Sequence, residues 1–289
     1  MAIKNAARNT MNNIKMILEN DADTATLSMQ TGTSIATLPL SNLQKYNNSR
    51  KFGSTDKAEI QIKIDLPQIK PISGLVLWEH NLSNTATVQL QLYSGANLTG
   101  TIDFDTGEFD AIPQRAFNDW NWQTQPVVSS LFDEWLVRFT QIYIDPTFCG
   151  SLLLTIKDPD NTDDELLINR LYMGQVFSPS VNFSFGHKHQ WDDKSTQLST
   201  DDGSLWSIEK PVKRKIKFDL NYLQESERSP FSTQLLRVGK RKDIFVNMFP
   251  GTTGQKGLDY AMAAKFTSVP ELTGDFHNNF TAPTALAEA

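Results

Sequence analysis

Cysteine is nearly absent from the sequence, since Cys149 is the one copy among 289 residues. A single cysteine excludes an intramolecular disulfide and any zinc site built on several cysteines, and a lone cysteine is typically buried and inert. Long apolar runs are also missing, because none approaches the roughly 18 residues of a membrane-spanning helix. The first residues lack the apolar core of a secretory signal. The sequence therefore predicts a protein made in a cytoplasm, used without a signal peptide and not inserted into a membrane.

Positive charge is in deficit, with 27 lysines and arginines against 33 acidic residues, a net charge of −6 and a pI near 5.3. Binding to nucleic-acid phosphates needs a clustered basic surface, so direct nucleic-acid recognition is not expected. Two small basic clusters remain. Residues 212–220, VKRKIKFDL, alternate in a period of two, which predicts a half-buried strand with a lysine-rich outer face. Residues 239–243, GKRKD, begin with glycine and are predicted to form a solvated turn.

Motifs for catalysis are missing as well. The sequence contains no nucleophile elbow, phosphate-binding loop or dinucleotide fingerprint, so we expect no enzymatic activity and no cofactor. The one close histidine pair is His187 and His189 in FGHKHQWDDKS, residues 185–195. On a strand both rings would lie on one face beside Asp192 or Asp193, which suits zinc or nickel in a metal-assisted hydrolase. The other two histidines are far away in the sequence, and a strand that ends in a polar turn explains the same residues.

The acidic segment DPDNTDDEL, residues 158–166, places oxygen-bearing side chains at alternate positions, as a calcium-binding loop does. It departs from the EF-hand pattern because Asp163 stands at the glycine position and Asn169 at the position of the bidentate glutamate. We therefore interpret it as an acidic hairpin between two apolar strands. A weak cation site stays open as the alternative, and no metal ligand is predicted.

Stretches typical of strands fill most of the chain. Apolar residues alternate with polar ones in EIQIKIDL (59–66) and TVQLQLY (87–93). Further apolar-rich runs cover residues 73–80, 135–145, 151–156, 166–173, 181–185 and 243–249. Polar turn clusters such as NLSN and SGAN separate them, and many short strands with polar turns favour β-sandwiches.

The fold class is therefore mainly β, with two β-sandwich domains. Residues 1–20 are the exception, since Ile14, Leu18 and three earlier apolar residues follow helical spacing and predict a short helix or arm. The expected units are the N-terminal helix or arm (1–30), a first sandwich (31–175), a second β domain (176–280) and a flexible tail (281–289).

Two tryptophans, Trp120 and Trp122, lie in the polar stretch NDWNWQTQP. Exposed indole rings could stack on sugar rings, because they offer a large apolar face with an N–H group at one edge. Burial in the sandwich or in a subunit interface, where tryptophan is enriched, explains the same pair. They are candidate glycan or interface contacts.

Several of these segments together resemble a group of tailed-phage structural proteins. In the first half, NL at 42–43, HNL at 80–82 and RLYMG at 170–174 resemble the landmarks of a discoidin-type, galactose-binding-like jelly roll. In the second half, the similar landmarks are FG (185–186), WDDKS (191–195), DG (202–203), KR (213–214) and DIFVNMFPG (243–251). That half resembles the ring-forming β domain of distal-tail-type baseplate proteins.

The resemblance implies a non-enzymatic structural protein of a bacteriophage tail tip or baseplate. It implies a homo-oligomeric ring, trimeric or hexameric, that docks other tail proteins after assembly in the host cytoplasm. Trp191 and Trp206 become candidate anchors of the assembly domain, and edge strands suit the pairing of neighbouring sheets. The alternative function is a carbohydrate-binding module that contacts host surface glycans through Trp120 and Trp122.

Overall fold

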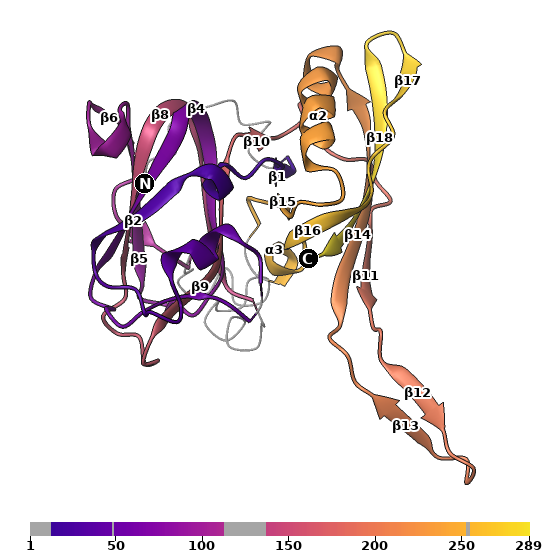
Figure 1. Cartoon of the computed structure of the whole chain (residues 1–289). Helices are drawn as coiled ribbons and strands as arrows, with labels where there is room; N and C mark the ends of the chain where they lie inside the picture. Colours follow the sequence, from indigo (N-terminus) through magenta and orange to yellow (C-terminus); the bar gives the residue numbers. More distant parts are fainter. Residues whose placement is uncertain (1–12, 48, 113–136, 253–254) are drawn as a thin grey trace, which may run out of the picture.

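The computed structural model describes residues 13–47, 49–112, 137–252 and 255–289. Strands dominate these residues, which confirms the mainly β fold class. Two large sheets lie next to each other, one built mostly from the first part of the chain and one mostly from the last part (Figure 1). Among the described residues, no helix has both the length and the apolar character needed to cross a membrane.

The first sheet closes into a β-sandwich, called the sandwich below. Its strands are β2 (Thr26–Thr31), β3 (Phe52–Ser54), β4 (Ile60–His80), β5 (Thr87–Tyr93), β6 (Ile102–Asp105), β7 (Phe109–Asp110), β8 (Phe139–Lys157) and β9 (Leu166–Gly174). The main order is β3-β9-β4-β8-β5-β6, with β2 paired to β4 and β7 paired to β5. Three short 3₁₀ helices connect them: η1 (Asp21–Thr24), η2 (Leu40–Gln44) and η3 (Ala96–Leu98).

Two long strands, β4 and β8, build both layers of the sandwich. Their register shifts between Asp65 and Lys70, so each strand has two halves that pair with different neighbours. The half of β4 before the shift pairs with β2, and the half after it pairs with β9. A break of this kind lets one strand bend from one layer into the other. Cys149 lies beside this break, where it is buried and free, as the sequence predicts.

The second sheet contains eight strands in the order β10-β1-β15-β16-β18-β14-β11, with β17 paired to β18. Its strands are β1 (Lys15–Ile17), β10 (Val176–Phe177), β11 (Lys188–Asp192), β14 (Lys213–Leu223), β15 (Ile244–Asn247), β16 (Ala261–Ser268), β17 (Thr273–Phe276) and β18 (Asn279–Glu288). Helix α2 (Glu225–Val238) and the short helix α3 (Gln255–Asp259) accompany it. Phe231, Leu235 and Val238 of α2 are buried in the core of this sheet.

Two local predictions are wrong, and a third is wrong where the chain is described. Of the helix or arm predicted over residues 1–30, residues 1–12 lie outside the described residues, and Lys15–Ile17 forms strand β1 between β10 and β15 rather than a helix. Residues 181–185 form no strand. The tail predicted at 281–289 is not flexible, since Asn279–Glu288 forms β18 between β16 and β14. At β1 and β18, pairing with distant strands decides the outcome, and local composition carries little information about such pairing.

The layer of the sandwich that contains β9 is buried on both faces. Leu75 and Leu77 of β4 point into the sandwich core, whereas Val76 and Trp78 belong to the core shared with the second sheet. Burial on both faces explains why residues 73–80 are nearly continuously apolar. Around Trp78, the rings of Phe139, Tyr172 and Phe245 form an aromatic cluster that joins the two sheets.

Candidate functional site

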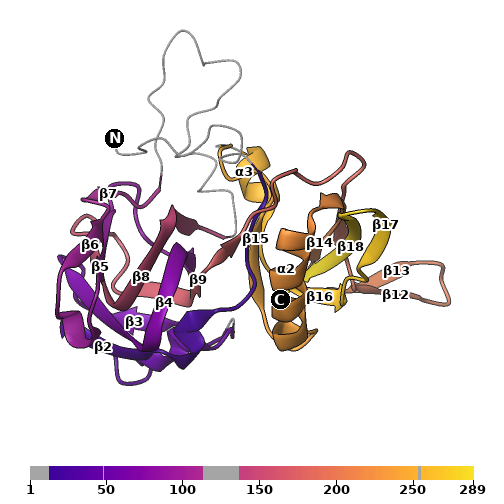
Figure 2. The same cartoon turned by 90° about the horizontal axis from the view of Figure 1, so that it is seen from above.

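A long two-stranded arm leaves the second sheet between β11 and β14. We define the arm as residues 193–212, which contain β12 (Thr196–Ser199) and β13 (Leu205–Ile208). These strands pair with each other only, in a separate two-stranded sheet. Figures 1 and 2 show the arm extending away from both large sheets. Its turn contains Asp202-Gly203, with Gly203 at a φ of 84°, a conformation that glycine adopts without strain.

The arm has one apolar face and one largely polar face. Leu198 pairs with Trp206, and Ile208 pairs with Thr196, so these side chains share one face. On this face Leu198 is 49% exposed, Trp206 69% and Ile208 48%. An isolated hairpin of this size is only marginally stable in water. Within the described part of the chain, no residue covers the apolar face of the arm.

The opposite face of the arm is more polar. It carries the pairs Gln197 with Ser207 and Ser199 with Leu205. Leu205 is 69% exposed and is the single apolar side chain among these four. Leu198 and Ile208 were not predicted as site residues. Their alternation with polar residues on either side of the Asp-Gly turn would have indicated a hairpin with an apolar face.

The tryptophan candidates differ in what the structure shows of them. Trp206 lies on the apolar face of the arm, and Trp191 lies on β11, 50% exposed, with its ring 5.5 Å from that of His189. Trp191 therefore lies on β11, just before the arm begins, and Trp206 lies on the arm itself. Trp120 and Trp122 lie outside the described residues.

The two histidines of the candidate metal site are part of an aromatic cluster. His187 contacts the rings of Phe183, Phe249 and Tyr260, and His189 contacts Tyr260. Burial lowers the pKa of His189, which favours the neutral imidazole. The nearby Asp192 carboxylate pairs with Lys215 at 2.9 Å. Within the described ranges, no three histidine, cysteine or acidic side chains come together as a metal site would require.

The acidic segment 158–166 holds a lysine where a calcium loop would hold its ion. The Lys57 ammonium donates to the carbonyl oxygens of Asn161 and Asp163, at 2.9 and 2.8 Å. The buried Asp158 carboxylate accepts hydrogen bonds from the Ser83 backbone N–H and from the Asn161 amide. A carboxylate surrounded by donors has few lone pairs left for a cation, so this segment is a structural turn.

His80 is a buried neutral histidine of the sandwich. The backbone N–H of Leu82 donates to its Nδ1 at 3.2 Å, so Nε2 carries the proton and donates to the Thr140 hydroxyl at 2.9 Å. The Thr140 hydroxyl donates in turn to the carbonyl of Ala111. Burial, with a smaller contribution from the charge of Arg138, lowers the pKa of His80 to about 3.

This shift predicts a loss of stability in mild acid. The unfolded chain takes up a proton at His80 near pH 6.5, whereas the folded chain does so only near pH 3. Stability therefore falls as pH falls through that window, by about 2 kcal/mol between pH 7 and pH 5. Urea unfolding of the wild type and of His80→Gln at both pH values measures it. An equal pH dependence in the two proteins would contradict this role for His80.

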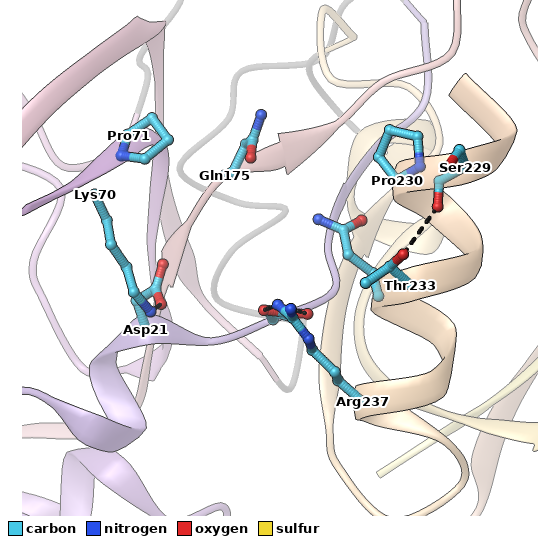
Figure 3. Close-up of a pocket in the computed structure, with 10 residues that line it drawn as sticks. Asp21, Lys70, Pro71, Gln175, Ser229, Pro230, Thr233 and Arg237 are labelled. Atoms are coloured by element: carbon cyan, nitrogen blue, oxygen red, sulfur yellow. Dashed lines mark hydrogen bonds and ion pairs between the residues drawn. The ribbon is translucent and has the colours of Figure 1, made fainter. Parts of the chain in front are cut away.

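A polar pocket of about 480 Å³ lies between the sandwich and α2 (Figure 3). Lys70 and Pro71 line one side, and Thr233 and Arg237 of α2 line the other. Its charges are already paired, because Lys70 binds Asp21 and Arg237 binds Glu19. The described lining therefore offers a ligand no unpaired charge and no catalytic pair.

Comparison with known proteins gives no family. No family model and no curated protein matches the chain. Among solved structures, it is similar to a chitosan-binding module of a Paenibacillus sp. IK-5 chitosanase/glucanase, with 10% identity over 54% of this chain and 99% of that one, at a TM-score of 0.37.

Two further modules are similar to the same extent. The family 32 CBM of C. perfringens NanJ, solved with galactose, is 11% identical over 55% of this chain and 98% of its own, at a TM-score of 0.35. A Streptococcus pneumoniae fucose-binding module is 11% identical over 54% and 98%, at 0.36. These scores are too low to carry an argument about ligands, and the assignment of the sandwich rests on its own strand pairing.

Proposed function

We propose that the protein is a non-enzymatic structural component that assembles with further copies of itself through the arm. The observation that carries this proposal is the apolar face of the arm, where none of the described residues of the same chain covers Leu198, Trp206 and Ile208. Exposed tryptophan beside aliphatic side chains is typical of interface centres. A second copy is the partner that is always present at the same concentration.

The setting we propose is the tail tip or baseplate of a bacteriophage virion, assembled in the host cytoplasm. What supports it is the resemblance of segments 42–43, 80–82 and 170–174 to a discoidin-type jelly roll of tailed-phage structural proteins. Short segments between residues 185 and 251 resemble the ring-forming domain of distal-tail-type proteins. Other tail proteins would dock on the trimeric or hexameric ring. Such a protein acts by burying surface between subunits, and the site residues described above suit that role better than catalysis.

Serine at Leu198 or Trp206 is expected to weaken self-association by about 30-fold for each substitution, because truncating a central apolar contact costs roughly 2 kcal/mol. Light scattering over a concentration series, with negative-stain images of the same fractions, measures it. The matched control is Leu205→Ser, which removes an exposed leucine from the opposite face of the arm.

Each outcome of that experiment is informative. A closed ring of the wild type and of Leu205→Ser, together with smaller species of the other two variants, supports the proposal. A wild-type monomer at every concentration contradicts self-assembly. Equal masses for all four proteins would mean that the arm is not the interface.

A second candidate function is glycan binding by the sandwich. The feature that favours it is the pair Trp120 and Trp122 in a polar segment, because tryptophan rings stack well on sugars. Retention of the wild type, but not of the double alanine variant, on a host surface polysaccharide would support it. Failure of the wild type to be retained on any such polysaccharide would remove it.

A further inference from the structure

The end of α2 and the turn after it form an exposed basic and apolar surface, called the basic end below. It consists of Leu236, Lys240, Arg241 and Lys242. Leu236 is 81% exposed, the highest value of any leucine, isoleucine, valine or tryptophan among the described residues, and all three cations are exposed as well. A large exposed leucine beside three like charges is an unusual combination on a surface without a partner.

Within the described residues, Lys240 and Arg241 have no counter-ion, whereas the charge of Lys242 acts on the Asp23 carboxylate. None of the ion pairs within the described residues includes Lys240, Arg241 or Lys242. The adjacent carboxylate of Asp243 is bound by Arg170 and by the Tyr172 hydroxyl. Clustered charges of one sign are tolerated more easily when a partner of opposite charge covers them.

The arm carries negative charge at its tip, opposite to the charge of the basic end, and an apolar face beside it. Its tip contains Asp201 and Asp202, both exposed. Thr200 and Ser204 donate to the Asp202 carboxylate, which keeps the pKa of that group below its ordinary value and the tip negatively charged. Behind the tip lies the apolar face with Leu198 and Trp206. A negative tip followed by an apolar face matches a basic turn followed by an exposed leucine.

The two surfaces lie apart within one chain. In Figures 1 and 2 the arm extends away from α2, with the second sheet between its base and the helix. The basic end of the same chain is therefore not what covers the arm. A contact between two different surfaces of identical chains is heterologous, and it produces a closed ring or an open filament.

We propose that the arm of one copy binds the basic end of the next copy, with Asp201 and Asp202 against Lys240 and Arg241 and with Leu198 and Trp206 over Leu236. This inference rests on the proposed function, because it names the acceptor for the arm. It also excludes a two-fold contact between arms, because such a contact would leave the basic end uncovered.

Exchange of charges tests the pairing. The arm variant is Asp201→Lys with Asp202→Lys, and the acceptor variant is Lys240→Glu with Arg241→Glu. Each variant alone brings like charges together and is expected to weaken assembly at least tenfold at low salt. A variant that combines both pairs of substitutions restores assembly, because every contact then joins opposite charges in a ring of any size. The matched control is Lys45→Glu with Arg50→Glu, an equal charge change at exposed sandwich residues.

Native mass by light scattering is the readout, and circular dichroism shows that each variant is folded. Loss in both variants, recovery in the combined variant and an unaffected control establish the contact. An acceptor variant that assembles like the wild type overturns this inference, while the role of the arm in the proposed function stands. Loss in both variants without recovery in the combined variant also overturns it. A wild type that never assembles refutes the proposed function, and this inference with it.

Discussion

Replacing Arg170 by methionine is expected to lower the free energy of unfolding by roughly 3–5 kcal/mol, because it leaves two partly buried carboxylates without their cation. Arg170 lies on β9 and is almost completely buried. Its guanidinium binds Asp243 through Nε at 2.9 Å and Asp23 through Nη2 at 2.8 Å. It also donates to the carbonyl of Leu43 at 3.2 Å.

This network ties together segments that are far apart in the sequence. Asp23 belongs to η1, Leu43 to η2, and Asp243 directly precedes β15 of the second sheet. The Tyr172 hydroxyl donates to the same Asp243 carboxylate at 2.8 Å, and burial raises the pKa of Tyr172 well above its usual value. The planar guanidinium reaches all three acceptors at once, so lysine is not an equivalent replacement.

Urea unfolding at pH 7 measures the effect, with Arg237→Met as the matched control. Arg237 forms an exposed ion pair with Glu19 at 3.2 Å, and a pair of that kind contributes at most about 1 kcal/mol. A loss for Arg170→Met no larger than that of the control would show that the network does not hold the sandwich and the second sheet together.

The parts of the fold with a strong period were predictable. Alternation in residues 59–66 and 87–93 placed β4 and β5 correctly, with Ile60, Ile62 and Ile64 in the core. The basic strand over 212–220 was also predicted. Its strand begins at Lys213, and Ile216, Phe218 and Leu220 are buried. A period of two is a local property that any half-buried strand must have.

Features that depend on distant pairing were not predictable. Ile14 and Leu18 fit the spacing of a helix, but the residues between them form strand β1, which lies between β10 and β15. Both side chains are buried. The candidate site shows the same limit. The sequence indicated an Asp-Gly hairpin, but nothing local determines that this hairpin leaves the sheet and exposes Leu198 and Trp206. Residues 239–243, which contain the cations of the basic end, were predicted as a solvated turn without any relation to the arm, and Leu236 was not singled out.

Removing residues 279–289 is expected to abolish folding of the second sheet. The segment forms β18, which lies between β16 and β14 and also pairs with β17. Losing a central strand exposes the edges of two neighbours and removes the buried side chains of Ala282 and Leu286 from the core. The combined cost exceeds the 5–15 kcal/mol that typically stabilises a whole domain.

Arg214 adds an electrostatic penalty to that loss. It is buried on β14, where Glu288 accepts from its Nη2 at 2.6 Å and from its backbone N–H at 3.0 Å. Its Nη1 donates to the carbonyls of Leu258 and Ala261, both at 3.0 Å. Without Glu288 the buried guanidinium loses this carboxylate, so Glu288→Ala alone is expected to cost roughly 3 kcal/mol.

Proteolysis followed by mass spectrometry distinguishes an unfolded second sheet from one that is folded but less stable. In the truncated chain we expect rapid cleavage within residues 213–268, whereas Glu288→Ala remains protected but unfolds at lower urea. Glu271→Ala is the matched control, because that carboxylate belongs to an exposed residue. Protection of 213–268 in the truncated chain would mean that β14 and β16 hold without the strand between them, and that the last residues are the flexible tail their composition suggests.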